Sequence, residues 1–384
     1  MKPLLDPARK FGLPSLLFFG YMCTLWMVLA YIPIYLTDLG FSHLQIGILI
    51  SVFPLSSLLL VIPFGIFSDK VSPKPLVSSG LALFALFLLG LRYGQGFWEI
   101  LLVFLLGGIG GSLFLISCSS LYYKFLGEGD RGRKLGFFMG LGLLGYGLGP
   151  LSGGHLLEGS DMDSLLWIAF LVLLPFLGLS FLLKDVKPIE FELVAYRGDI
   201  ARKEVIVLAA LTFLVALHMG TEQTSFSLLL KKDIGLTETS IGTMFCFIGI
   251  TIGGLTIING FVSDRVSGRG MGLSPLLYLG IFVSGLFNIV LMFAGTFGTV
   301  LMVRLLHVFG DSLFIVSQRV IISKLFLTER IGGNLGLMAT VHTLGIFVGA
   351  VISGAIPGYI LPFVFAGSLA IAAIAPAMLT RPRF

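Results

Sequence analysis

Charged residues are scarce in this sequence. Asp, Glu, Lys and Arg make up 12% of its 384 residues, whereas soluble globular domains carry about 25%. Hydrophobic residues account for 56%, and the mean hydropathy is +1.02. This composition excludes a soluble globular domain and predicts that most side chains face lipid or other buried helices.

Cysteine is also scarce, and several motifs are missing. Cys23, Cys118 and Cys246 lie inside apolar runs, and their odd number and spacing match no disulfide or metal framework. No G-x4-G-K-[ST] stretch, the phosphate-binding loop of many ATPases, occurs, which argues against a protein driven directly by ATP hydrolysis. The net charge is +5, but no basic patch with interleaved aromatic residues is present, so we expect no nucleic-acid partner. The sequence predicts neither a cofactor nor a metal site.

Long apolar runs dominate what is present. A helix needs about 20 mainly apolar residues to cross a bilayer, and the sequence offers twelve such runs. The loops between them are short, so successive helices should be antiparallel neighbours. The predicted fold class is an all-α integral membrane protein with twelve transmembrane helices. The predicted spans are 14–36, 44–67, 76–93, 98–120, 135–157, 164–183, 204–230, 239–262, 272–294, 298–320, 335–356 and 361–380.

The positions of Lys and Arg predict the orientation. With both termini in the cytoplasm, 21 of the 25 Lys and Arg residues fall in cytoplasmic segments, three in outer loops, and Arg304 inside a span. This asymmetry follows the positive-inside rule. The first run, 14–36, is longer than the core of about 7–15 residues in a signal peptide, so we expect it to be retained. We expect a multi-pass protein of a bacterial inner membrane, or an equivalent plasma membrane, with cytoplasmic termini.

The chain also contains an internal repeat. The charged stretch 184–203 separates six predicted spans from six, and it divides the chain into an N-terminal bundle, residues 1–183, a cytoplasmic linker, residues 184–203, and a C-terminal bundle, residues 204–384. In transporters built from two such halves, the substrate binds near the midplane between them. The matching segments are 38–47 with 233–242, 65–71 with 260–266, and 102–117 with 302–317.

Two corresponding loops carry a family resemblance. Residues 65–74 read GIFSDKVSPK, and residues 260–269 read GFVSDRVSGR. Both resemble the loop G-x-L-a-D-r-x-G-r-k of the major facilitator superfamily, although Ser72 and Ser267 replace its second glycine. The resemblance covers the whole chain. It implies two pseudo-symmetric six-helix bundles, a monomer, and a central cavity lined by the first, fourth, seventh and tenth helices.

The chemistry of these loops predicts a conformational latch. Glycine permits close helix approach, and a carboxylate at a helix end can accept hydrogen bonds from a neighbouring helix N-terminus or pair with an Arg. Such a contact would hold one conformation and break in the other, whereas the alternative is a set of solvated loop charges. The predicted latch residues are Gly65, Asp69, Lys70, Gly260, Asp264 and Arg265.

The fifth span resembles the antiporter motif of drug/proton exporters within the superfamily, with the spacing G-x8-G-x3-G-P-x2-G-G. Small residues give a flat face for packing, and a proline can bend the helix, so generic packing is the alternative explanation. The fourth span departs from the exporter pattern, because Phe104 stands where many such exporters carry an Arg, and the repeat-equivalent position holds Arg304. The motif residues are Gly136, Gly145, Gly149, Pro150, Gly153 and Gly154.

Ionisable residues inside the predicted spans are few, and such groups are costly at bilayer depth and usually functional. His218 and Glu222 share a helix face, while Arg304, His307 and Asp311 fall on one stripe about 60° wide. Burial disfavours a charged carboxylate, so we expect Glu222 and Asp311 to carry protons. Arg304 and the histidines would tune that exchange or hold an anionic substrate group. The alternative is a buried ion-pair network that holds helices together.

The predicted cavity wall of the N-terminal half is aromatic and hydroxylated rather than charged. Four polar side chains of the first span fall on a stripe about 80° wide, which suggests contact with an amphipathic or lipophilic substrate. Aromatic residues more often serve packing or interface belts, and this remains the alternative. The predicted cavity residues are Tyr21, Thr24, Tyr31, Tyr35, Ser117, Gln223 and His342.

These features together predict a proton-coupled secondary transporter that works by alternating access, and the glycine motif favours an exporter of small amphipathic or lipophilic compounds. The alternative is a proton symporter for a small organic solute or anion, since His307 and Asp311 resemble the tenth-helix pair of sugar/proton symporters. A channel and a polytopic membrane enzyme are more remote alternatives. For an enzyme, His218 and Glu222 offer half of a metal site, but no third ligand is evident in the sequence.

Overall fold

The computed structural model describes residues 8–41, 43–127, 129–186, 195–380 and 382. Every regular element in these residues is helical, as the sequence predicts. The elements are η1 (Ala8–Gly12), α2 (Leu13–Leu29), α3 (Ile32–Asp38), α4 (His43–Lys70), α5 (Pro73–Tyr93), α6 (Phe97–Lys124), α7 (Arg131–Gly159), α8 (Met162–Ser180), α9 (Ala195–Ile200), α10 (Lys203–Thr221), η2 (Glu222–Phe226), η3 (Leu229–Asp233), α11 (Glu238–Gly268), α12 (Ser274–Val290), η4 (Leu291–Phe293), α13 (Phe297–Leu325), η5 (Thr328–Arg330), α14 (Ile331–Ala355), α15 (Leu361–Ala372) and α16 (Ile374–Leu379).

Twelve helical segments of the described chain are long and apolar enough to cross a membrane, so the predicted number of spans is confirmed. Several helices extend beyond the predicted runs. For example, α7 begins at Arg131 and α13 continues to Leu325. The apolar run marks only the part of a helix in hydrocarbon, while the backbone hydrogen bonds continue into the charged ends.

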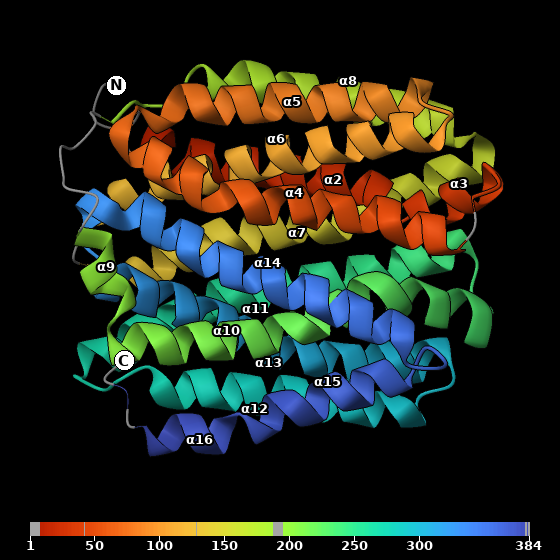
Figure 1. Cartoon of the computed structure of the whole chain (residues 1–384). Helices are drawn as coiled ribbons and strands as arrows, with labels where there is room; N and C mark the ends of the chain where they lie inside the picture. The colour runs from red at the N-terminus through yellow and green to blue at the C-terminus, as the bar shows by residue number, and fades with distance from the viewer. Residues whose placement is uncertain (1–7, 42, 128, 187–194, 381, 383–384) are drawn as a thin grey trace.

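The long helices lie side by side (Figure 1). The helices of residues 8–180 occupy mainly the upper part of this view and those of residues 203–379 mainly the lower part, and α14 runs through the middle beside α4. Both ends of the chain and α9 lie at the same end of the bundle. We call this end the basic face, because the junctions at α4–α5, α6–α7 and α11–α12 lie there with their Lys and Arg residues.

The two halves meet chiefly through α7 against α11 and α4 against α14. The α7–α11 crossing is so close that an added Cβ at Gly249 would lie 2.2 Å from the Cα of Gly147. Such small-residue contacts let helix backbones approach in a bilayer, where packing rather than the hydrophobic effect holds helices together.

Several spans are interrupted where the sequence suggested continuous helices, among them the first and the seventh. The first breaks at Ala30 and Tyr31, between α2 and α3, because Pro33, the second residue of α3, has no N–H to donate to the carbonyl of Leu29, and its ring clashes with that carbonyl in a continuous helix. The seventh changes from α10 to the π-helical turn η2, which begins at Glu222. A π-helical turn within a helix occurs frequently at functional sites, and here it starts at a buried ionisable residue.

Candidate functional site

The centre of the C-terminal half contains a cluster of ionisable side chains from the seventh and tenth spans. Arg304 on α13 donates from Nη2 to Oε1 of Glu222 at 2.6 Å, and from Nη1 to Oδ1 of Asn288 on α12 at 3.3 Å. The Arg304 side chain is 2% exposed and that of Glu222 is 17% exposed. The pair is therefore largely withdrawn from water. Electrostatic attraction between two charges is stronger in the protein interior than at a surface.

His307 connects the two carboxylates of the cluster. Its Nε2 lies 3.1 Å from Oε1 of Glu222 and 3.0 Å from Oδ2 of Asp311. Its Nδ1 lies 2.9 Å from the carbonyl oxygen of Ser284, an acceptor that fixes a proton on Nδ1. The ring is 0% exposed, so both of its nitrogen atoms interact with protein groups rather than with water.

His218 completes the cluster, which we call the ionisable cluster: His218, Glu222, Arg304, His307 and Asp311. The Nε2 atom of His218 lies 3.5 Å from Oδ1 of Asp311, and the rings of His218 and His307 meet edge to face at 5.2 Å. All five residues that the sequence predicted for proton coupling therefore gather at one place. The sequence shows no third metal ligand beside His218 and Glu222, whereas the structure places His307 and Asp311 of α13 next to His218.

An aromatic layer adjoins the cluster and crosses to the N-terminal half. The guanidinium of Arg304 lies 4.8 Å from the ring centroid of Phe226, and Phe226 contacts Phe245 at 5.7 Å. Phe245 contacts Tyr146 of α7 at 5.7 Å, and Tyr146 contacts Trp26 of α2 at 4.6 Å. We call Trp26, Tyr146, Phe226 and Phe245 the aromatic layer.

The aromatic layer was not predicted from the sequence. The predicted stripe on the first span carries Tyr21, whereas Trp26 lies about 140° away around that helix. Polar character guided that prediction, although a substrate wall can equally be built from rings without hydroxyl groups. The layer pairs large aromatic residues from four different spans, and a search for stripes on single helices does not detect such a pairing.

The predicted hydroxyl stripe on the first span does not form one wall. Tyr21 is fully buried between Phe84 and Phe114, with ring distances of 4.9 and 4.7 Å, so it packs inside the N-terminal half. Thr24 is also fully buried and donates to the carbonyl of Gly20 within its own helix. These side chains are packing residues in this conformation, in agreement with the alternative explanation.

The break in the first span separates the remaining two stripe residues from Tyr21 and Thr24. Tyr31 lies at the break and donates to the carbonyl oxygen of Pro150 at 2.6 Å, which ties the break to the proline of α7. Tyr35 lies beyond the break on α3 and is half-buried. The continuous helix assumed in the prediction is absent, and for this reason the four residues do not share one face.

The other predicted cavity residues lie in different environments. Ser117 on α6 is fully buried, while Gln223 is exposed beside Glu222. His342 on α14 is half-buried, with Nε2 3.2 Å from the sulfur of Met219. The structure therefore places Gln223 next to the ionisable cluster and leaves His342 outside its hydrogen-bonded network.

Asp69 makes the contact that the sequence predicted for a latch. Its two carboxylate oxygens accept from the backbone N–H groups of Gly332 and Gly333 at 3.1 and 2.8 Å, at the start of α14. Its Oδ1 lies 3.1 Å from Nζ of Lys124, and its Oδ2 accepts from the Tyr196 hydroxyl at 2.9 Å. A helix N-terminus stabilises an anion through free N–H groups and its dipole.

Asp264 repeats this contact in the other half. It accepts from the backbone N–H groups of Gly132 and Arg133 at 2.7 and 2.9 Å, at the start of α7. We call the two contacts the Asp69 clasp and the Asp264 clasp. Each joins the end of a helix in one half to the start of a helix in the other. Lys70 and Arg265, also predicted for the latch, are exposed at the surface.

The linker helix α9 docks across the Asp69 clasp. Tyr196 reaches Asp69, while Asp199 accepts from Nε and Nη2 of Arg330 at 2.9 and 3.0 Å and from Asn334 at 2.9 Å. Burial opposes the charged form of Asp199, but the hydrogen bonds from Arg330 and Asn334 outweigh it and lower its pKa. The linker therefore contacts both halves at the basic face.

The glycine motif of α7 serves two contacts. Gly136 lies against α11, and Gly145, Gly149 and Gly153 lie against α2. At Gly149 an added Cβ would lie 2.3 Å from the carbonyl oxygen of Cys23, so a larger residue would push α2 away. The predicted packing face is present, and it holds the broken first span against α7.

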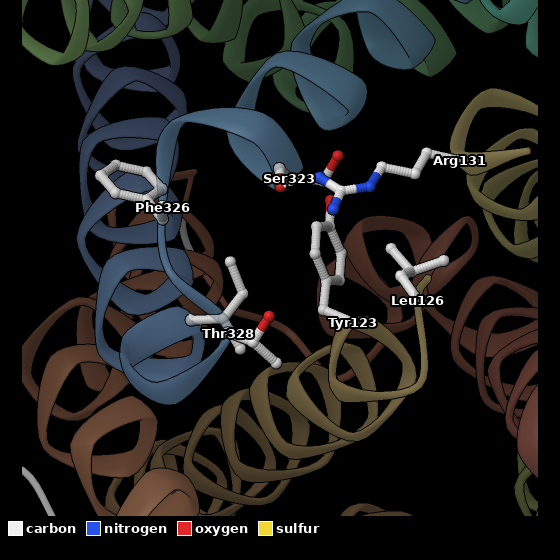
Figure 2. Close-up of a pocket in the computed structure, with 7 residues that line it drawn as sticks. Tyr123, Leu126, Arg131, Ser323, Phe326 and Thr328 are labelled. Atoms are coloured by element: carbon white, nitrogen blue, oxygen red, sulfur yellow. Dashed lines mark hydrogen bonds between the residues drawn. The ribbon is translucent and has the colours of Figure 1, made fainter. Parts of the chain in front are cut away.

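A separate small pocket lies at the basic face between the two halves, lined by residues of α6, α7, α13 and η5 (Figure 2). Arg131 donates to the carbonyl oxygen of Ser323 there, and Tyr123 donates to that of Arg319 at 3.3 Å. The cavity volume of about 10 Å³ suits about one water molecule. These contacts close the basic face and do not form a substrate site.

Comparison with known proteins agrees with this architecture. The family model described as Major Facilitator Superfamily matches residues 15–198 and 208–384. The chain belongs to the major facilitator superfamily. The resemblance predicted from the two loops is thereby confirmed, and the protein is a multi-pass membrane transporter of this superfamily.

Individual relatives are distant. The chain is 24% identical over 344 residues to the quinolone resistance protein NorA of Staphylococcus aureus (strain MSSA476), covering 86% of this chain and 85% of NorA. It is 24% identical over 338 residues to the uncharacterized MFS-type transporter MJ1560 of Methanocaldococcus jannaschii, covering 84% of each chain. The crystal structure of the human organic anion transporter MFSD10 (TETRAN) shares the fold, with a TM-score of 0.75, 14% identity, and coverage of 96% of this chain and 99% of that one.

Proposed function

We propose that this transporter is a proton-coupled exporter of small amphipathic or lipophilic compounds that works by alternating access. The observation that carries the proposal is the ionisable cluster, in which Glu222 and Asp311 are joined through His307 deep inside the C-terminal half. Ionisable groups at this depth are costly and are retained for ion pathways and proton relays.

The charges of the cluster favour exchange of a proton for a cation. With both imidazoles neutral, the carboxylates of Glu222 and Asp311 and the guanidinium of Arg304 carry a net charge of −1. One bound proton makes the cluster neutral. A monovalent cationic substrate would do the same, so either occupant compensates the buried charge and the two would compete.

The aromatic layer supplies the apolar part of the proposed substrate site. Trp26 and Tyr146 come from the N-terminal half and Phe226 and Phe245 from the C-terminal half, so a compound between them would contact both halves. Aromatic faces attract cations as well as apolar surface. The 24% identity to a quinolone resistance protein supports a compound of drug-like size and export as the direction.

The two clasps would provide the alternating access. Both lie at the basic face, which the positive-inside rule assigns to the cytoplasm, and both hold the halves together there. We therefore propose an inner or plasma membrane location with cytoplasmic termini, a monomer, and a conformation closed to the cytoplasm. Breaking the clasps would open the cytoplasmic side for substrate loading.

Uptake of an organic anion is less well supported by the same geometry. Arg304, the cation that would attract such a solute, is already paired at 2.6 Å with Glu222. An anion would add to the net negative charge of the deprotonated cluster. Proton symport of an anion would thus need more than one proton per cycle to leave the occupied site neutral.

Proton movement in proteoliposomes tests the proposal. The purified protein is reconstituted with a pH-sensitive dye inside, and tetraphenylphosphonium, benzoate and lactose are added in turn. Glu222→Gln and Asp311→Asn are measured beside the wild type. Glu329→Gln is the matched control, because that carboxylate is exposed at the basic face.

We expect the lipophilic cation to move protons in the direction opposite to itself in the wild type and in Glu329→Gln. Both cluster variants should reduce this movement by at least about tenfold, since each removes a proton acceptor. Transport without proton movement, or wild-type behaviour of both cluster variants, would make the carboxylates structural. Proton movement in the same direction as lactose or benzoate would establish symport instead.

A further inference from the structure

Three side chains of the ionisable cluster have the arrangement of metal ligands. One ligand atom from each of His218, His307 and Asp311 lies within 4.8 Å of the others, and all three residues are buried. Nε2 of His307 lies 3.0 Å from Oδ2 of Asp311, and Nε2 of His218 lies 3.5 Å from Oδ1 of the same carboxylate. The ligand atoms come from α10 and α13, two long packed helices rather than mobile loops.

These separations match the edge of a small coordination tetrahedron. Zinc binds imidazole nitrogen and carboxylate oxygen at about 2.0–2.2 Å, and a tetrahedron of that radius has ligand-to-ligand edges of roughly 3.3–3.6 Å. The observed 3.5 Å lies in this range and the observed 3.0 Å lies just below it, although the two distances end at different oxygens of Asp311. The three ligand atoms lie within 4.8 Å of one another, so a small movement of the side chains would place them around one ion. Glu222, with Oε1 3.1 Å from Nε2 of His307, is placed to complete the set.

The second nitrogen of His307 is oriented as in metal sites. Its Nδ1 lies 2.9 Å from the Ser284 carbonyl oxygen, and metal-ligating histidines almost always donate their other N–H to a carbonyl, carboxylate or water. With the proton held on Nδ1, the Nε2 lone pair points at two carboxylate oxygens. That arrangement repels unless a cation lies between them, either a proton on Nε2 or a metal ion.

We propose that His218, His307 and Asp311 bind one divalent transition-metal ion such as Zn²⁺ or Co²⁺, with Glu222 or a water molecule as the fourth ligand. Two imidazoles select this class over Mg²⁺ and Ca²⁺, which prefer all-oxygen sites. On binding, the proton on Nε2 of His307 leaves to water and the metal takes its place. The metal is thus a competitor of the transported proton, and this regulatory consequence rests on the proposed proton coupling, whereas the binding itself does not.

Access to the site runs past Glu222. The side chains of His307, His218 and Asp311 are 0%, 2% and 8% exposed, but that of Glu222 is 17% exposed, and its neighbour Gln223 is exposed. A metal ion entering from this side meets a carboxylate first. Glu222 must then exchange Arg304 for the metal, or leave the fourth position to water.

Cobalt absorption tests binding without any transport measurement. The protein is purified with an affinity tag that contains no histidine and is titrated with Co²⁺, whose visible bands report tetrahedral coordination by nitrogen and oxygen. His218→Gln and Asp311→Asn remove ligands, and both are used so that one misfolded variant leaves the other to decide. The matched controls are His342→Gln, a half-buried histidine outside the network, and His155→Gln, an exposed one.

We expect one Co²⁺ per chain in the wild type and in both controls, displaced by Zn²⁺, and at least about tenfold weaker binding in each ligand variant. Absence of the tetrahedral bands in the wild type, or unchanged binding in a folded ligand variant, overturns the site. Zn²⁺ should also inhibit substrate-driven proton movement in the wild type. Proton movement without Co²⁺ binding would refute only the metal site, and Co²⁺ binding without proton movement would refute only the coupling.

Discussion

Replacing Asp69 with asparagine should shift the transporter toward the conformation that is open at the basic face. The carboxylate accepts from two backbone N–H groups at the start of α14, while its partner Lys124 belongs to the same half. Only contacts that differ between two states change their equilibrium. In the proposed opening, the bonds to α14 and to Tyr196 would break, whereas the pair with Lys124 would persist.

The magnitude follows from those contacts. A hydrogen bond to a charged group is worth about 1.5–3 kcal/mol, and asparagine keeps one of the two acceptors but loses the charge. We therefore expect a loss of about 2–3 kcal/mol from the closed state, which changes the equilibrium constant by roughly 30- to 140-fold. Asp264→Asn should have a smaller effect, because the Asp264 side chain is 23% exposed and that of Asp69 is 0% exposed.

Distances between spin labels measure this shift. Lys70 at the end of α4 and Glu329 in η5 are exposed and belong to opposite halves, so cysteines at these positions can carry labels after the three native cysteines are replaced. The closed state should dominate in the labelled parent and in Asp233→Asn, which changes an exposed carboxylate at the opposite face. A longer distance should become the main population in Asp69→Asn.

An unchanged distance distribution in folded Asp69→Asn would refute the reasoning, because the bonds to α14 would then contribute nothing to closure. An equal shift in Asp69→Asn and Asp264→Asn would refute the part that rests on burial. In that case the number of helix-terminal hydrogen bonds, which is the same in both clasps, would set the energy.

Three further predictions test packing, pH response and substrate contact. Gly249→Ala should lower the melting temperature, at a cost of about 1–3 kcal/mol for overpacking, while Gly254→Ala on the same helix, where an added Cβ meets nothing within 4 Å, should leave it within error. Burial opposes ionisation of Asp199, but its hydrogen bonds to the start of α14 lower its pKa below the ordinary 3.8. Its stabilisation of the docked linker should thus be complete above that pH and lost only as pH falls below it, so protease cleavage within the linker should be constant between pH 5.5 and 8. Tyr146→Leu should weaken binding of tetraphenylphosphonium by about 2- to 5-fold through loss of a cation–π contact of about 0.5–1 kcal/mol, and Tyr146→Phe should retain it in a dye-displacement assay.

Most of the fold could be predicted because membrane spans are specified by length and composition. The twelve runs, the repeat and the loops around Asp69 and Asp264 were all readable, since a bilayer demands satisfied backbone groups and about 20 apolar residues per helix. The interruptions were harder. Pro33 is visible in the sequence, but whether the helix breaks at Tyr31 depends on the direction in which the helix axis must continue. No local residue pattern marks the π-helical turn at Glu222.

The candidate site was predictable where a rare residue type marked it. Five ionisable residues within apolar spans stand out, and two of them, His218 and Asp311, lie 93 positions apart yet meet at 3.5 Å. The aromatic layer was not predictable in this way, because Trp26 and Tyr146 are common components of membrane helices. Only the ring contacts of the aromatic layer across four spans distinguish Trp26 and Tyr146 from the buried ring of Tyr21.

The repeat also explains why the ionisable cluster is confined to one half. The offset of 200 residues places Phe104, Gly107 and Gly111 where the C-terminal half has Arg304, His307 and Asp311. An added Cβ at Gly107 would lie 2.5 Å from Cδ2 of Phe87, and one at Gly111 would lie 2.4 Å from the Tyr21 hydroxyl.

Rings from neighbouring helices thus fill, in the N-terminal half, the space that charged side chains occupy in the C-terminal half. Phe104 itself contacts Phe87 edge to face at 5.7 Å. Phe104→Arg would therefore not reproduce the fourth-helix arginine that many proton-coupled exporters carry. It would set a guanidinium against that ring in a fully buried position, where a charge without a carboxylate partner costs several kcal/mol. In the N-terminal half, aromatic packing therefore occupies the positions that ionisable side chains hold in the C-terminal half.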